Sequence, residues 1–380
     1  MELGFTPEQE LLRRNAREFA ARHVAPLAAA VDEEARHPAE VFAGLAEGGW
    51  LGIPIPVEYG GAGADFVSHC IAVEEISRAC SSTGFTLSFH AGIIGLALLN
   101  HGTARQREEY LVPLAKGRHL GAFSLTEPGA GTDVMAIGAT AVRDGGDYVL
   151  NGVKTFVSNG PIADTYIFFV WTDRAARGRG MSAFIVPRGT PGLYPQEAMK
   201  KMGLRGSQTS EVILKDCRVG EENRLGAEGE GLAVAMAGFE RGRVGIAAQA
   251  CGILGAALEE SIRHARDRVQ FGRPIASHQA VAWMLADMAT DLEAARHLTY
   301  HAARLRDAGR PFAKEASMAK LFATEAAMRH TVKAVQIHGG YGYVKGAKVE
   351  RLMRDAKIAE IYEGTSEAQR MIISGRVVRP

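Results

Sequence analysis

The C-terminal part of the chain contains three long stretches that favour helices, because few helix-breaking residues other than isolated glycines interrupt them. They cover residues 232–268, about Gln279–Asp307 and about Ala313–His338. Ser277 is a possible N-cap for the second helix, Gly339-Gly340 ends the third, and a short last helix follows Thr365 or Ser366. Long antiparallel helices of this kind predict a four-helix bundle.

The first part of the chain, residues 1 to about 122, also favours helices, although shorter ones. Thr6-Pro7-Glu8-Gln9 is a capping box with proline at the first helical position. Prolines and the glycine-rich run 60–63 break this zone into pieces. Further helices are expected over residues 70–78 and 92–99, and the second is apolar enough to be buried.

Between these helical zones the sequence changes character. The runs 148–150 and 153–157 flank Asn151-Gly152, which predicts a β-hairpin at this dipeptide. Other β-branched or aromatic runs, bounded by turn residues, cover 166–172, 183–186 and 211–219. A small antiparallel β domain is therefore expected.

The chain of 380 residues is long enough for several domains. We expect an α+β multidomain protein with a helical domain at residues 1–122, a β domain at 123–228 and a helical bundle at 229–380.

Composition excludes several classes of function. Lys and Arg number 44 against 43 Asp and Glu, which argues against a nucleic-acid binder. No apolar run approaches the ~18 residues of a membrane helix. Acidic residues near the start disfavour a leader peptide. The four cysteines are scattered, so a reducing, cytoplasmic location is expected and the cysteines are expected to be buried apolar groups: Cys70, Cys80, Cys217 and Cys251.

A search for common cofactor motifs is negative. There is no P-loop, no H-E-x-x-H and no G-x-G-x-x-G after a strand. Gly340-Tyr341-Gly342 is followed by Lys345 where that fingerprint needs glycine. The 12 histidines are dispersed, and no metal site is expected.

Two short runs carry candidate chemistry. In the run 361–367, Glu363 stands between large apolar side chains and Gly364, a setting that would raise its proton affinity and make it a candidate base. In the run 124–133, hydroxyls at Thr126 and Thr132 accompany two glycines, which makes a loop whose backbone donors can face a ligand. Taken alone, this second run is more typical of a plain surface turn.

Together with three other motifs, these runs give the chain a resemblance to the acyl-CoA dehydrogenases, flavoproteins that oxidise an acyl-CoA thioester to its trans-2-enoyl form. The resemblance covers essentially the whole chain in matching order. It rests on the runs 126–133, Arg268-Val269-Gln270-Phe271-Gly272, 336–342, Arg351-Leu352-Met353-Arg354-Asp355-Ala356-Lys357 and 361–365.

The resemblance implies an FAD site. The positions beside the flavin ring or adjoining the substrate are Phe123, Leu125, Thr126 and Thr132. The strand on the other side of the ring contributes Phe156, Val157 and Ser158. The contacts to the phosphate and adenosine half are Thr365 and Glu367. Groups that reach the flavin of a neighbouring subunit are Arg268, Gln270, Phe271, Gln336 and Gly340. Such sharing makes a dimer the smallest active unit and implies a homotetramer built as a dimer of dimers.

The resemblance also implies that Glu363 is the catalytic base. A minority of the family carries the base on the long helix instead, at a position that here is Gly242, which cannot take a proton. Substrate contacts are implied at Thr132, Gly364, Glu240 and Arg243, the last two reaching the pantetheine arm. Arg243 and Glu240 are three residues apart, so an ion pair between them is the structural alternative.

Two residues depart from the commonest family pattern. Phe156 replaces a tryptophan beside the flavin, and Thr132 replaces a serine. The implied reaction is unaffected: Glu363 takes the α-proton, flavin N5 takes the β-hydride, and the electrons pass to an electron-transfer flavoprotein. The general character of the sequence is closest to that of family members acting on short straight or short branched acyl chains.

Other functions stay open at this point. Acyl-CoA oxidases, which pass electrons to oxygen, share the fold but are usually longer. Nitroalkane oxidases have aspartate at the base position, and a decarboxylating activity needs an extra basic group in the acyl pocket. A helical scaffold that has lost its flavin is the alternative from another class.

Overall fold

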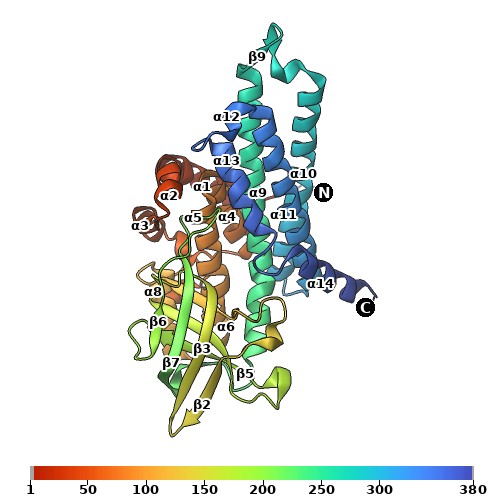
Figure 1. The fold of residues 1–380 in the computed structure, drawn as a ribbon. Coiled ribbons are helices and arrows are strands. Elements are labelled where there is room, and N and C mark those ends of the chain that lie inside the picture. Colours follow the sequence, from red (N-terminus) through yellow and green to blue (C-terminus); the bar gives the residue numbers. More distant parts are fainter. Residues whose placement is uncertain (1–3, 379–380) are drawn as a thin grey trace.

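The structure is a computed structural model that describes residues 4–378. The chain folds as a helical zone, a β sheet and a second helical zone in that order, and the sheet lies at one end of the long C-terminal helices (Figure 1). The N-terminal α-helices are α1 Pro7–Phe19, α2 Ala28–Glu34, α3 Ala39–Glu47, α4 Phe66–Ala79, α5 Ser81–Leu87, α6 Leu96–His101, α7 Ala104–Gln106 and α8 Val112–Ala115.

The capping box predicted at the start of α1 is confirmed. Thr6 Oγ1 accepts a hydrogen bond from Gln9 N at 3.2 Å, and Thr6 N donates to Gln9 Oε1 at 3.1 Å. The Gln9 side chain then donates to Asp65, the residue that caps α4, at 2.7 Å. The first helix is thereby tied to the start of α4, the helix on which it packs.

A continuous helix covers Ser81–His101, where α5 and α6 flank a π-helical segment at Ser88–Gly95. By length and composition it could cross a membrane, with a mean hydropathy of 1.4, but 94% of that window is buried inside the protein. The expectation that no apolar run approaches membrane length was therefore wrong. Serine, threonine and glycine interrupt the apolar residues here without ending the helix.

The described part of the middle zone contains one sheet of eight strands, in the order β6-β7-β3-β2-β4-β5-β8 with β1 beside β4. The strands are β1 Gly121–Ser124, β2 Thr140–Asp144, β3 Asp147–Ser158, β4 Thr165–Trp171, β5 Met181–Pro187, β6 Leu193–Pro195, β7 Thr209–Gly220 and β8 Arg224–Leu225. The sheet is mixed and not purely antiparallel as expected, because β1 and β2 both pair with β4 in parallel.

The predicted hairpin at Asn151-Gly152 was wrong. Strand β3 runs straight through this dipeptide, and the turn lies earlier, between Asp144 and Asp147. The register against β7 shifts between Leu150 and Gly152, which marks a β-bulge. The Asn151 side chain accepts a hydrogen bond from Asp216 N of β7 at 2.8 Å, so the dipeptide serves the bulge and makes no turn.

The C-terminal helices are α9 Gly231–Asp267, α10 Gln279–Asp307, α11 Ala313–His338, α12 Gly340–Tyr343, α13 Lys348–Ala359 and α14 Ser366–Val378. The predicted bounds of α10 and α11 are confirmed. Ser277 is not the N-cap of α10: His278 holds that position, and the Ser277 hydroxyl donates to Pro274 O at 2.8 Å. A two-stranded ribbon, β9 Val269–Gln270 and β10 Arg273–Pro274, sits at the end of α9 far from the sheet (Figure 1).

Candidate functional site

Glu363 lies in the turn between α13 and α14, and its backbone has a left-handed conformation. The φ angle is +55° at Glu363 and +94° at Gly364. A non-glycine residue in this conformation costs about 1–3 kcal/mol unless its surroundings hold it there, and such residues gather at functional sites. The glycine that follows can adopt a positive φ without this cost. The turn therefore presents the Glu363 side chain in a direction that a regular helix end would not.

The carboxylate of Glu363 is enclosed, although the residue as a whole is only half-buried. Its Oε2 atom is shielded from solvent and has no hydrogen-bond partner among the described residues. Burial raises the pKa of Glu363 to about 7, against the lowering effects of Arg243 and Lys320. A carboxylic acid with a pKa near neutrality is suited to take and return a proton.

The space around this carboxylate exists because α9 has glycine at position 242. A Cβ atom built on Gly242 would lie 2.8 Å from Glu363 Oε2 and 2.8 Å from Ile93 Cδ1. Gly242, where the sequence resemblance implies an alternative base position, thus faces Glu363 across one small space. The Glu363 carboxylate fills it from the C-terminal turn.

We expect Gly242→Ala to displace the carboxylate, because the added methyl group would lie 2.8 Å from Glu363 Oε2 and 2.8 Å from the buried Ile93 Cδ1. If Glu363 is the base, this displacement slows proton abstraction. A misplacement of about 1 Å can cost about 10²-fold in rate. Stopped-flow absorbance of the flavin after mixing with acyl-CoA, at several pH values, measures the loss of rate. Gly375→Ala on α14, where an added Cβ meets nothing within 4 Å, is the matched control.

Arg243 lies beside Glu363 and does not form the ion pair with Glu240 that was the structural alternative. The Arg243 side chain is buried, its Nε atom has no hydrogen-bond partner, and no salt bridge joins it to Glu240 within the described residues. Burial lowers the pKa of Arg243, and the charges of Glu363 and Glu240 oppose this effect. The guanidinium group of Arg243 is therefore free to contact a ligand beside Glu363.

Aromatic and amide groups fill the interior next to the base. Tyr362 donates its hydroxyl hydrogen to Gln249 Oε1, and its ring stacks on Phe85 with centroids 4.9 Å apart. Phe85 in turn stacks on Phe89 at 5.7 Å. The Gln249 amide is held by Ser81, to whose Oγ it donates at 2.9 Å. The sequence did not single out Gln249.

The loop 126–133 leaves the sheet directly after β1 and is held on both sides. Glu127 and Ala130 exchange two backbone hydrogen bonds of 3.0 Å, which close a tight turn. Thr126 O accepts from Thr155 N of β3 at 3.0 Å. Thr126 is half-buried and Thr132 is exposed, so both can face a ligand.

A buried ion pair fixes this loop to the sheet, and the sequence did not predict it. Lys154 Nζ, fully enclosed, donates to Glu127 Oε1 at 2.7 Å, to Leu125 O at 3.1 Å and to Phe169 O at 2.7 Å. Glu127 also accepts hydrogen bonds from the backbone N–H groups of residues 138 and 139. Burial lowers the pKa of Lys154 to about 8, although Glu127 acts in the opposite direction. Five hydrogen bonds therefore converge on one charge pair under the loop.

Phe156 projects from β3 next to this loop. It has a φ of +53° at a second register shift between Lys154 and Val157, and its side chain is 67% exposed. Val157 points the other way, into the core beneath the sheet, so it can meet a ligand only through its backbone. A strained strand residue that exposes an aromatic face, beside hydroxyls at Thr126 and Ser158, fits a flat ring system such as a flavin.

Four more of the predicted cofactor residues fall into two places. Phe123 and Leu125 are buried at and just after β1, and the Phe123 ring meets Phe239 of α9 at 5.8 Å. Thr365 and Glu367 lie at the start of α14, where Thr365 Oγ1 accepts from Ala368 N at 3.2 Å. Glu367 is exposed.

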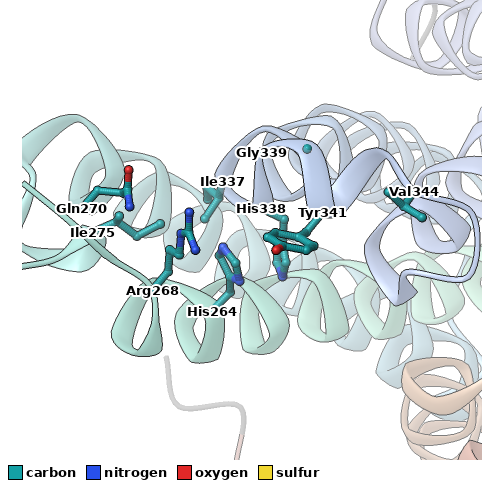
Figure 2. A pocket seen from close by; sticks show the side chains of 10 residues that line it. His264, Arg268, Gln270, Ile275, Ile337, His338, Gly339, Tyr341 and Val344 are labelled. Carbon is teal, nitrogen blue, oxygen red and sulfur yellow. The ribbon is translucent and has the colours of Figure 1, made fainter.

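A separate pocket of about 450 Å³ lies at the far end of α9. Arg268, Gln270 and Gly340 line it as a group, whereas Gln336 is not among its lining residues and Phe271 points outward with 94% exposure. Figure 2 shows His264 and His338 facing each other in this pocket, with ring centroids 4.2 Å apart. The 26 residues between Gly242 and Arg268 span roughly 39 Å of helix at about 1.5 Å per residue, so this pocket is remote from Glu363.

Comparison with known protein families gives matches along the chain. The family model described as acyl-CoA dehydrogenase, N-terminal domain, matches residues 6–118. The middle-domain model matches residues 122–217, and the C-terminal-domain model matches residues 229–378.

Individual relatives are similar over their full lengths. A protein of Clostridium acetobutylicum named acyl-CoA dehydrogenase, short-chain specific, is 48% identical over 100% of both chains. The structure of butyryl-CoA dehydrogenase from Megasphaera elsdenii is 41% identical with a TM-score of 0.97, over 100% of both chains. A chain in a structure of the electron transferring flavoprotein of Acidaminococcus fermentans is 45% identical with a TM-score of 0.98, again over 100% of both.

Proposed function

The chain belongs to the acyl-CoA dehydrogenase family, and on that premise we propose that it oxidises a short acyl-CoA thioester to the trans-2-enoyl-CoA with Glu363 as base. The observation that carries the assignment of the base is the enclosed, unpartnered Oε2 atom of Glu363. A carboxylate kept out of water and without a structural partner has its proton-binding capacity free for a substrate.

Glu363 takes the proton from the carbon next to the thioester carbonyl. Its pKa of about 7 lets the carboxylate form predominate in weakly alkaline solution while keeping it more basic than a free carboxylate. As the proton leaves, negative charge develops on the thioester oxygen and needs a donor. The Glu363 backbone N–H donates to no other group within the described residues, so it is available for this role.

FAD, when bound, supplies the acceptor for the β-hydride. We propose that the loop and the bulged strand hold it through Phe123, Leu125, Thr126, Thr132, Phe156, Val157 and Ser158. The exposed face of Phe156 and the adjoining hydroxyls support this placement. Thr365 and Glu367 contact the remainder of the cofactor from the start of α14, and Glu240, Arg243 and Gly364 contact the substrate.

A second copy of the chain completes the cofactor site in this proposal. Arg268, Gln270, Phe271, Gln336 and Gly340 lie at or near the end of α9 that is remote from Glu363. We propose that a neighbouring subunit brings them to its FAD. We therefore propose a dimer as the smallest active unit and a homotetramer as the assembly.

A short acyl chain is the proposed substrate. The interior behind Glu363 is filled by Tyr362, Gln249 and Phe85, which leaves little room for a long chain to extend past the base. The name of the Clostridium acetobutylicum relative includes the words short-chain specific. Electrons are proposed to leave through an electron-transfer flavoprotein, in line with the Acidaminococcus fermentans structure among the neighbours.

Anaerobic mixing of the holoenzyme with acyl-CoA thioesters of four to sixteen carbons, straight and branched, tests this function. We expect rapid loss of the yellow flavin colour with the shortest substrates and progressively less with longer ones, because Tyr362 and Gln249 occupy the space that a longer chain needs. A preparation that bleaches with no member of the panel, or that takes up no FAD, would refute the proposal. Reoxidation that is as fast with oxygen as with an electron-transfer flavoprotein would indicate an oxidase.

A further inference from the structure

The strained turn that carries Glu363 is held from behind by two buried side chains. Gly364 O accepts hydrogen bonds from Lys320 Nζ at 2.7 Å and from Gln369 Nε2 at 2.8 Å. Gln369 Nε2 also lies 3.2 Å from Glu363 O. Lys320 comes from α11 and Gln369 from α14, and both have 0% exposure. The left-handed conformations at Glu363 and Gly364 are thus fixed from two helices.

A hydrogen bond to Gly364 O does not require a charged donor, because the neutral amide of Gln369 already supplies one. Removing an ammonium group from water costs several kcal/mol unless a partner compensates. No salt bridge joins Lys320 to a carboxylate in the part of the chain that the structure describes. Its charge instead acts on Glu363, whose negative form it favours.

We propose that Lys320 is a positioning residue for the base: its bond to Gly364 O holds the Glu363–Gly364 turn and places a buried cation beside Glu363. This inference rests on the proposed function of Glu363.

The other charges near this pair come from each element that packs around it. Arg243 of α9 also favours ionised Glu363 and disfavours ionised Lys320. Glu360 at the end of α13 and Glu367 of α14 favour the ammonium form of Lys320. Burial lowers the pKa of Lys320 to about 8, while the pKa of Glu363 is about 7. As pH rises through the neutral region, Glu363 therefore gains its negative charge while Lys320 begins to lose its positive charge.

Lys320→Met tests the proposal, since methionine fills similar space without charge or donor. The pH dependence of flavin reduction by butyryl-CoA is measured in the holoenzyme. In parallel, exchange of the α-protons of acetyl-CoA in D₂O is followed by NMR. Acetyl-CoA has no β-carbon, so the exchange reports the base and not hydride transfer.

We expect the acid limb of both profiles to move to higher pH by about one unit in Lys320→Met, because a positive charge near Glu363 is lost. Below the limb this makes both processes about tenfold slower. Lys320→Gln keeps a hydrogen-bond donor without the charge. It should show the same shift of the acid limb, with a smaller loss of rate at high pH. It also carries the test if the methionine variant does not fold. Lys333→Met, at an exposed lysine on the same helix, should leave both profiles unchanged.

An acid limb at the same pH in wild type and both Lys320 variants would overturn the proposal, whatever the change in maximal rate. Glu363→Gln separates this outcome from failure of the proposed function. If that variant still exchanges acetyl-CoA protons, Glu363 is not the base. If it does not, while the Lys320 variants titrate as wild type, only the role of Lys320 is refuted.

Discussion

Glu363→Gln should yield a folded, yellow protein whose flavin is no longer reduced by acyl-CoA. An amide cannot take the α-proton, and loss of a positioned general base costs about 10²–10⁴-fold or more. The fold should tolerate the change because Glu363 Oε2 makes no hydrogen bond that the amide would break. Stopped-flow absorbance at the flavin band, under anaerobic conditions with excess butyryl-CoA, measures the effect.

The same substitution has a consequence for stability with a definite sign. The pKa of Glu363 is raised to about 7 by burial, so the folded state resists ionisation of this group. Wild type therefore loses stability as pH rises from the unfolded-state value through 7, and the glutamine variant does not. We expect the Tm of Glu363→Gln to rise relative to the Tm of wild type as the pH is raised from 5 to 8.

The matched control is Glu325→Gln, because Glu325 of α11 pairs with Arg370 of α14 at 2.7 Å. The flavin of this variant should be reduced by acyl-CoA at the wild-type rate. Rapid bleaching of Glu363→Gln would show that another group takes the proton.

Lys154→Met should be the most destabilising of the changes considered, since it leaves Glu127 charged and buried without its cation. Removing one partner of a buried pair costs about 3–5 kcal/mol. The loop 126–133 rests on this pair through Leu125 and Glu127, so FAD affinity should fall as well. Urea unfolding gives the free energy of unfolding, and titration of the apoprotein with FAD gives its Kd.

A double variant sharpens this experiment. Lys154→Met/Glu127→Leu removes both charges and should recover part of the stability, but not all, because the N–H groups of residues 138 and 139 lose their acceptor. Arg218→Met, at an exposed ion pair with Asp144, should change stability by less than about 1 kcal/mol. Equal effects of Arg218→Met and Lys154→Met would refute a special role for the buried pair.

Local signals in the sequence predicted the helices well, because periodicity and caps are encoded by neighbouring residues. The bounds of α10 and α11 and the capping box at Thr6 are cases of this kind. Predictions that depend on distant strands failed. Asn151-Gly152 has the composition of a hairpin turn, yet its conformation is set by β7, some 60 residues later. The helix α13 was not predicted as an element, although one of its motifs was singled out.

The sequence predicted the candidate base from its apolar setting, but it did not predict the buried side chains that hold the site in place. Glu127 and Lys154 are 27 residues apart, so no local pattern in the sequence indicates that they pair. Lys320 did leave a signal. It falls at helical spacing with Ala316, Ala323 and Ala327, so the sequence places a lysine on the buried face of α11.

The small space above Gly242 has an evolutionary consequence. It admits one carboxylate, which in this chain arrives from the turn that carries Glu363. A glutamate added at 242 while Glu363 remained would force two acids into contact, and their repulsion would keep one protonated. On the function proposed for Glu363, losing that acid first would leave no base. Moving the acid between these two positions one substitution at a time would therefore pass through an impaired enzyme.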